Sequence, residues 1–170
     1  HEFCQESEAW REDLPAMNIV AAQTAYNLIP EYDAHVQRIE WVRLNTTAGV
    51  AAGLTPKDLD KALYTMTPGD PDVLTMDDRI EPGESVTGGL TVRVILVPEF
   101  NTHDVAEWFA NRYWKGIVAK AKAIRMRDDK KRWTNPNKAL EYEGEFRDQI
   151  ADAKGELRRE YKDGFVGLTA

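Results

Sequence analysis

The sequence has little of the chemistry that disulfide bonds, membrane spans and zinc sites require. Cys4 is the single cysteine among 170 residues, so the chain cannot form an internal disulfide bond, which suits a reducing cytosol. No apolar run approaches the roughly 20 residues that cross a membrane as a helix. The histidines His1, His35 and His103 are far apart and lack the ligand spacing of a zinc site. These absences argue against secreted, membrane-spanning and zinc-dependent proteins.

The charge balance is acidic, with a formal net charge of -7 and a sequence pI near 5.0. Domains that bind nucleic acid on their own normally carry a basic surface, so this balance argues against such a binder. It is compatible with a protein that surrounds DNA without binding it tightly. Hydrophobic residues make up 42% and charged residues 30% of the chain, which is typical of a globular domain.

Apolar periodicity predicts one helix followed by a block of strands. Phe3 and Trp10 lie seven residues apart, which predicts a helix over 2–14 that Pro15 ends. Because the chain begins at His1, inside this expected helix, we expect the natural protein to extend upstream. Alternation of apolar and polar residues predicts strands in 17–29, 34–45, 73–76 and 89–98.

A short helix is expected within this block, over 55–63, and the rest of 65–89 is rich in turn residues. Thr55 would be its N-cap and Pro56 its first residue, with Leu59 and Leu63 on its buried face.

Two long helices are predicted in the last part of the chain. The first begins at a cap on Thr102 or Asp104 and runs to about Arg127. Its expected buried stripe consists of Val105, Phe109, Ile117, Ala121 and Ile124. The second has Asn135 as its N-cap and Pro136 as its first residue, and Gly164 ends it. Its expected buried stripe consists of Ala139, Tyr142, Phe146, Ile150, Ala153, Leu157 and Tyr161.

This order predicts the α+β class, with the strands grouped apart from the helices. We expect a helical bundle made of the N-terminal helix and a long C-terminal antiparallel helix hairpin, with a small antiparallel β domain inserted between them. The expected segments are an N-terminal helix in 1–15, a β-rich domain in 16–100, the hairpin in 101–163 and an apolar tail in 164–170.

The sequence predicts no catalytic, cofactor-binding or metal-binding residues. The one carboxylate cluster, formed by Asp70, Asp72, Asp77 and Asp78, has the ligands that Mg²⁺ or Ca²⁺ prefers but lacks EF-hand spacing. It supports an alternative hypothesis of a small metal-dependent hydrolase. Cys4 has no motif around it and is interpreted as a small packed residue.

The clearest surface signal is basic and lies near the end of the first long helix. Two interpretations stay open: a surface for an acidic partner or DNA phosphates, and an ordinary solvated face. The cluster comprises Lys115, Lys120, Lys122, Arg125, Arg127, Lys130, Lys131 and Arg132. The Glu-rich start of the last helix, "EYEGEFRD", offers a complementary charge. Glycines inside these helices, Gly116, Gly144 and Gly155, indicate close approach of another helix in the subunit or across an interface.

Several segments together resemble a known family. They are "EFCQESEAWREDL", "VAAQTAYNL", "HVQRIEWVRLN", "LTPKDLDKAL", "PGDPD", "LTVRVILVPEF", "DVAEWFANRYWKGIVAKAKA" and "KRWTNPNKALEYEGEFRDQIADAKGE". In this order the chain resembles the head-to-tail adaptor (connector) proteins of short-tailed bacteriophages, including the tail tubular A-type proteins. The resemblance covers nearly all of the chain and consists of aromatics, glycines and prolines rather than reactive residues.

The resemblance implies a structural virion protein at the head-tail junction, assembled in the host bacterial cytoplasm, and not an enzyme. Such adaptors form a ring of twelve copies, bind the portal protein on one side and the tail nozzle on the other, and often contact tail fibres. DNA passes through the lumen during packaging and ejection without specific binding, and no membrane or cofactor is involved. The C-terminal segment is expected to dock on the portal.

The candidate interface residues lie in two places: the basic segment between the two long helices, here named the connector, and the apolar C-terminal tail. They are Lys130, Lys131, Arg132, Trp133, Phe165, Val166 and Leu168. Trp133 has two interpretations: a wedge that closes the helix hairpin, or an exposed anchor for a neighbouring subunit or tail protein. A third hypothesis for the whole chain is a helical regulator with an exposed partner groove.

Overall fold

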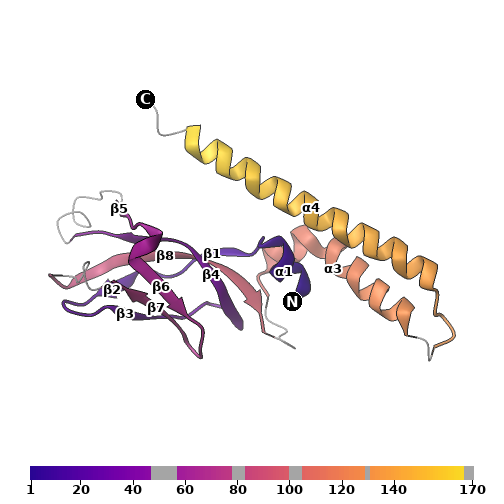
Figure 1. Cartoon of the computed structure of the whole chain (residues 1–170), viewed down its shortest axis with the longest axis horizontal. Coiled ribbons are helices and arrows are strands. Elements are labelled where there is room, and N and C mark those ends of the chain that lie inside the picture. Colours follow the sequence, from indigo (N-terminus) through magenta and orange to yellow (C-terminus); the bar gives the residue numbers. More distant parts are fainter. Residues whose placement is uncertain (47–56, 78–82, 100–104, 129–130, 167–170) are drawn as a thin grey trace. The chain divides into compact units, whose positions relative to one another are not determined.

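The structure, a computed structural model, describes the backbone of residues 1–46, 57–77, 83–99, 105–128 and 131–166 and the side chains of these residues up to 159 (Figure 1). Contacts between residues divide the chain into two units. One consists of His1–Ala9 with His103–Ala170 and contains the long helices, and the other is Trp10–Thr102 and contains the strands. The two units are described separately below as the helical unit and the β unit.

The β unit contains two antiparallel sheets among its described residues. The first has the order β1 (Arg11–Asp13), β8 (Val86–Pro98), β4 (Ala34–Leu44) and β5 (Lys57–Asp58), and β2 (Met17–Ile19) also pairs with β8. The second has the order β3 (Ala25–Leu28), β7 (Asp72–Met76) and β6 (Tyr64–Thr67). A single 3₁₀ turn, Lys61–Leu63, precedes β6.

The core of the β unit forms around β8, the longest strand, which pairs with three others. Its alternating residues Leu90, Val92, Val94 and Leu96 are fully buried, and Val92 lies opposite the equally buried Val42 of β4. Leu28, Leu74 and Met76 supply buried side chains from the second sheet. The apolar residues that alternate in the sequence of β8 therefore lie on one buried face of the strand, as expected.

A polar row crosses the other face of the first sheet. Trp41 of β4 lies between two arginines, with the Arg43 Cζ 3.9 Å and the Arg93 Cζ 5.1 Å from the centroid of its ring. Arg43 pairs with Asp58 of β5 and Arg93 with Asp13 of β1. Stacking of guanidinium groups on an indole and their pairing with carboxylates are both favourable, so this row links four strands by their side chains.

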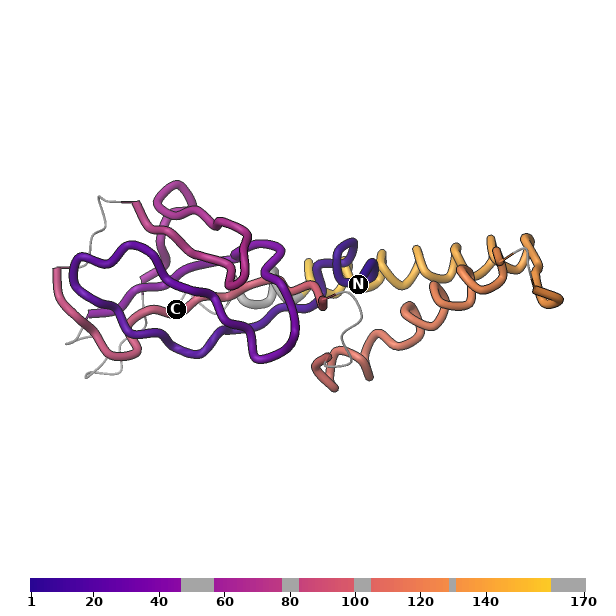
Figure 2. The backbone as a smooth tube through the Cα atoms, turned by 90° about the horizontal axis from the view of Figure 1, so that it is seen from below, coloured from indigo at the N-terminus to yellow at the C-terminus, as the bar shows by residue number. Residues whose placement is uncertain are grey.

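The helical unit consists of α1 (Glu2–Ser7), α3 (Glu107–Arg127) and α4 (Pro136–Val166). Both views show α3 and α4 side by side, joined at one end by the connector (Figures 1 and 2). Their contacts run in opposite directions, since Arg127 pairs with Glu143 and Arg112 with Glu156. The hairpin is therefore antiparallel. The Lys138 amide donates to Oδ1 of Asn135 at 3.1 Å, which confirms Asn135 as the N-cap of α4.

Phe3 of α1 is the centre of the aromatic core of the helical unit. Its ring centroid lies 6.2 Å from that of Phe109, 5.3 Å from that of Tyr113 and 6.1 Å from that of Phe146. These geometries are tilted or edge-to-face, as aromatic pairs prefer. Cys4 of α1 is also buried. Its burial raises the pKa of the thiol to about 11, because the thiolate would be desolvated.

The chain is α+β, but the expected helical bundle with a small inserted β domain is wrong. Strands are the more prominent part, with eight of them among the described residues. The expectation failed at the N-terminus, where α1 ends at Ser7 and Glu8 takes a left-handed conformation with φ 54°. Trp10 then joins the core of the β unit, where its ring packs on Tyr32, instead of sharing a helix face with Phe3.

Other elements differ more locally from the expectation. Lys57–Asp58 is a strand and Lys61–Leu63 a 3₁₀ turn capped by Asp60, so the expected helix over 55–63 is absent from its described part; Thr55 and Pro56 lie outside the described residues. The N-cap of α3 is Ala106, while the expected caps Thr102 and Asp104 are outside the description. Gly164 does not end α4, which continues to Val166.

Candidate interaction surface

Two parallel rows of side chains run along α3, and only one of them is buried. The inner row, Phe109, Tyr113, Gly116, Lys120 and Ala123, repeats at spacings of four and three residues and faces α1 and α4. The outer row, Ala110, Trp114, Ile117, Ala121 and Ile124, has the same spacing one residue later. One residue turns a helix by about 100°, so the rows lie on adjacent sides of α3.

The outer row of α3 exposes large apolar side chains. The exposed fractions are 54% for Trp114, 40% for Ile117 and 57% for Ile124. A seam with spacings of four and three is the pattern by which one helix packs against another. The expected buried stripe is therefore wrong for Ile117, Ala121 and Ile124, because the helix turns its smaller residues Gly116, Ala119 and Ala123 to the interior.

The same arrangement recurs on α4. Its inner row contains Ala139, Phe146, Ile150, Ala153 and Leu157, all buried, which confirms most of the expected stripe. Tyr142 of that stripe is half-buried, and the side chain of Tyr161 is outside the description. The outer row, one residue later, is exposed and contains Leu140, Gly144, Arg147, Ala151 and Lys154.

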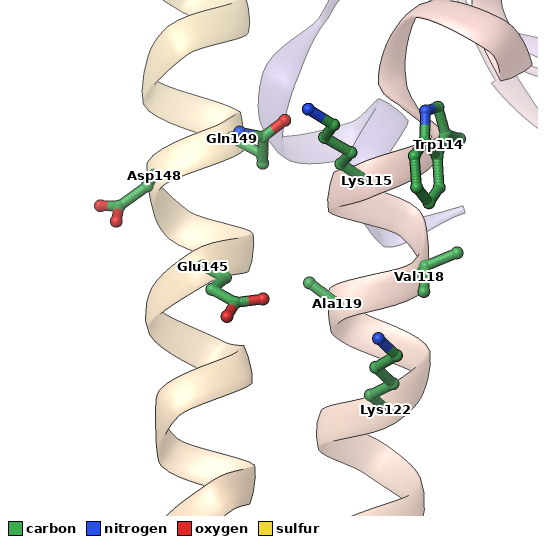
Figure 3. Close-up of a pocket in the computed structure, with 8 residues that line it drawn as sticks. All are labelled: Trp114, Lys115, Val118, Ala119, Lys122, Glu145, Asp148 and Gln149. Atoms are coloured by element: carbon green, nitrogen blue, oxygen red, sulfur yellow. The ribbon is translucent and has the colours of Figure 1, made fainter.

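A shallow groove of about 390 Å³ lies between the helices on one side of the hairpin (Figure 3). Lys115 and Lys122 of α3 and Glu145 of α4 line it. Figure 3 shows Lys115 and Glu145 pointing across the gap, whereas Asp148 points away from α3 and Trp114 points away from α4. Basic side chains of α3 and an acidic side chain of α4 thus face the same groove, and Trp114 and Asp148 at its margins point outward from the hairpin.

A charged cluster ties α1 to the hairpin. The Lys120 Nζ lies 2.5 Å from Glu2 Oε1 and 3.0 Å from Glu143 Oε1, and Arg127 also reaches Glu143. The hydrogen bond to Glu2, followed by that to Glu143, raises the pKa of Lys120 above its usual value. The hydrogen bond from Lys120 lowers the pKa of Glu143. Lys120, expected as part of a basic surface patch, instead holds the unit together.

At the connector, Trp133 has an exposed fraction of 53%, and Lys131 Nζ lies 5.8 Å from the centroid of its ring. Arg132 is also exposed. The Thr134 hydroxyl donates to the carbonyl of Lys131 at 2.8 Å, and the Asn135 amide donates to that of Met126 at 3.1 Å. The backbone bonds around Trp133 close the connector, while its ring stays largely in solvent.

The structure describes only some of the other predicted interface residues. Phe165 and Val166 belong to the last turn of α4, but their side chains are not described, and Lys130 and Leu168 lie outside the described residues. The structure therefore brings Lys131, Arg132 and Trp133 together at the connector. The outer row of α3 was not predicted to be a surface, because large apolar residues are typical of a core. The available signal was the adjacent inner row, which has the same spacing and is apolar except for Lys120.

The carboxylate cluster does not form a metal site among the described residues. Asp72 is buried, and its Oδ2 accepts a hydrogen bond from the Val36 amide at 2.7 Å. Its Oδ1 accepts one from the Gly69 amide at 3.0 Å. Asp70 is exposed, and Asp78 lies outside the description. Asp72 thus joins β7 of the second sheet to β4 of the first.

The sequence matches no protein-family model, and no curated protein matches it in sequence. Within the described part of the chain, no helix is both long and apolar enough to cross a membrane. A function has to be inferred from the exposed surfaces of the two units and from the resemblance of the sequence segments quoted above.

Proposed function

We propose that the protein is a structural component of a bacteriophage virion, a head-to-tail adaptor that forms a ring between the portal and the tail nozzle. The observation that carries this proposal is the distribution of exposed apolar side chains. Of the eight large ones exposed among the described residues, six lie on the α3–α4 hairpin: Trp108, Trp114, Ile117, Ile124, Trp133 and Leu140. Large exposed apolar side chains concentrated on one helix hairpin are candidates for contacts with other proteins.

Tryptophan is the residue most enriched at binding hot spots. Three of the exposed side chains are tryptophans, placed at the start and middle of α3 and at the connector. A subunit in a closed ring must bind a neighbour on each side and partners above and below, so it needs several separate contact surfaces. The hairpin offers such surfaces. The resemblance of the sequence to adaptors implies which partners bind them: the portal, the nozzle and further copies of the chain.

The acidic balance of the chain supports the same proposal. DNA phosphates bind tightly to basic surfaces, and this binding would slow the passage of the genome through a ring. In this proposal the protein does not bind DNA specifically, and the lumen lets DNA slide. No specific observation favours the metal-dependent hydrolase, because both oxygens of Asp72 accept backbone hydrogen bonds.

The experiment is electron cryomicroscopy of the purified protein mixed with the portal protein encoded by the same genome. The proposal predicts rings of this protein stacked on one face of the portal. Portal rings without added density, at protein concentrations well above the portal concentration, would contradict it. A variant with Trp133→Ala serves as a second sample, since loss of stacking with normal folding would place Trp133 at a contact.

A further inference from the structure

The second sheet of the β unit has two edge strands, β3 and β6, with β7 between them. Hydrogen bonds alternate along antiparallel strands, so every second residue of an edge strand turns its backbone N–H and C=O groups away from the sheet. On β6 the Asp77 amide donates to the carbonyl of Leu63 at 2.8 Å, which fixes the alternation. The outward-facing backbone groups of β6 are therefore those of Tyr64 and Met66.

The two edge strands differ in how these outward-facing groups are covered. On β3 the side-chain amide of Gln23 donates to the outward-facing carbonyl of Ala25 at 2.6 Å. On β6 no described residue forms a hydrogen bond with the outward-facing groups of Tyr64 or Met66. Proteins commonly protect an edge strand with charged residues, and β6 has none, although Pro68 ends it. The edge of β6 is thus open to pairing with a further strand.

A pocket of about 260 Å³ lies at the end of this open edge, where β6 begins and β7 ends. None of the residues that line it is basic, and its polar side chains are two threonines and an aspartate. The lining residues are Ala62, Leu63, Tyr64, Thr65, Thr75, Met76 and Asp77. Asp58 and Asp60 lie close enough to act on Tyr64, whose pKa is raised by burial and then by these two carboxylates. The surroundings of the pocket are therefore acidic.

From these observations we infer that β6 binds an extended segment of another protein as a fourth, antiparallel strand of the second sheet, with a lysine or arginine of that segment in the pocket. In strand addition, backbone hydrogen bonds provide affinity and side-chain pockets provide specificity. Both other strand pairs of this sheet are antiparallel, so the added strand continues the pattern. Residues opposite each other on paired strands share a face, so the partner residue opposite Thr65 lies on the face of the pocket.

The acidic surroundings select the charge of that partner residue. A basic side chain opposite Thr65 can place its apolar stem on Leu63 and its charged end near Asp77. The inference goes beyond the proposed ring, because it concerns the β unit alone and requires a partner with an extended basic segment.

The test uses the whole chain and a short acetylated peptide in which threonine and valine alternate around a central lysine. Fluorescence anisotropy of the labelled peptide measures affinity, and hydrogen exchange followed by NMR locates the contact. The amides of Tyr64 and Met66 are expected to exchange rapidly in the chain alone and to become protected when the peptide binds. The amides of Thr65 and Thr67, which pair with β7, serve as internal controls and should be protected in both states.

Two modified peptides leave the protein unchanged and so avoid any effect on its folding. N-methylation of the residues on either side of the lysine removes amides that face β6, and should weaken binding at least about tenfold. N-methylation of the lysine itself removes an amide that faces away from β6, and should leave affinity unchanged. A peptide with glutamate in place of the lysine should bind at least about tenfold more weakly, because its charge is repelled by the acidic surroundings.

Three variants of the chain test the same edge from the other side. Met66→Pro removes an outward-facing N–H without removing a hydrogen bond inside the sheet, and should abolish binding. Met66→Ala keeps that N–H and should retain binding. Asn27→Pro makes the matching change on β3 and should also retain binding. Circular dichroism checks that each variant is folded.

Several outcomes would overturn the inference. One is the lysine peptide leaving the exchange of Tyr64 and Met66 unchanged at concentrations up to about 1 mM. Another is equal affinity for the lysine and glutamate peptides, or for the two N-methylated forms. Protection of the same two amides that rises with protein concentration, without peptide, would make the occupant a second copy of this chain and would also overturn it.

Discussion

Phe3 lies directly against Gly116, so closely that a Cβ added to this glycine would stand 2.7 Å from Cε2 of the Phe3 ring. It would also stand 3.0 Å from the Cβ of Gln149 on α4. Such distances are shorter than ordinary van der Waals contact. Gly116 is therefore the point where α1 and α4 both approach α3, and the absence of a side chain lets the aromatic core of the helical unit close.

Gly116→Ala is predicted to destabilise the helical unit although alanine is the better helix former. The propensity gain of about 1 kcal/mol is outweighed by overpacking, which typically costs about 1–3 kcal/mol. Gly144→Ala is the matched control, because space around Gly144 is open and only the propensity gain applies. Urea unfolding followed by circular dichroism at 222 nm measures both. Equal stabilisation by the two substitutions would show that Phe3 does not pack on Gly116.

Trp133→Ala is predicted to cost little folding stability, about 1 kcal/mol or less, because half of the side chain is already exposed. Phe109→Ala is the matched comparison in the same unit, where a buried aromatic typically contributes about 3–5 kcal/mol. Unfolding midpoints of the two variants in urea separate the two interpretations of Trp133. A loss close to that of Phe109→Ala would make Trp133 a wedge of the hairpin; a small loss favours an anchor for another chain.

Asp72→Asn is predicted to destabilise the β unit by about 1–3 kcal/mol, because an amide NH₂ group would face a backbone N–H donor in a buried place. Asp70→Asn controls for the loss of one negative charge, as the Asp70 side chain is exposed. Thermal unfolding of the wild type with and without 5 mM Mg²⁺ or Ca²⁺, about a typical saturating level for weak sites, completes the test. A rise in the wild-type midpoint with either ion would revive the hydrolase hypothesis.

Strong periodicity made several elements predictable from the sequence. The long strands β4 and β8 and the helix α4 alternate or repeat over ten residues or more, so most apolar positions agree on a single buried side. The strands β1, β5 and β6 could not be recognised, because they have two to four residues and contain charges or isolated apolar groups. Their conformation is determined by pairing with a neighbouring strand, a contact between distant parts of the sequence.

The predicted buried stripe of α3 was wrong for a different physical reason. The sequence contains two rows with identical spacing, one fully apolar and one apolar except for Lys120, and side-chain size favoured burial of Ile117 and Ile124. The side that packs on α4 is instead the one whose small residues, Gly116 and Ala123, allow close approach. Periodicity alone does not say which of two apolar rows meets the partner helix. The same ambiguity hid the candidate interaction surface, since exposed and buried apolar residues look alike in a sequence.

Acid unfolding tests the cluster around Lys120. Its hydrogen bond lowers the pKa of Glu143, so Glu143 contributes stability that is present above the usual pKa of about 4.5 and is lost as the pH falls through the lowered value. Glu143→Gln should therefore be less stable than wild type at pH 7, and the difference should shrink toward pH 3. Urea unfolding at half-unit pH steps measures this, with Glu141→Gln on the exposed side of α4 as the control for charge. The raised pKa of Lys120 predicts the converse in alkali, because its contribution is full below about pH 10.5 and declines above it. A difference between wild type and Glu143→Gln that stays constant from pH 7 to pH 3 would mean that the ionised carboxylate does not stabilise the packing of α1 on the hairpin.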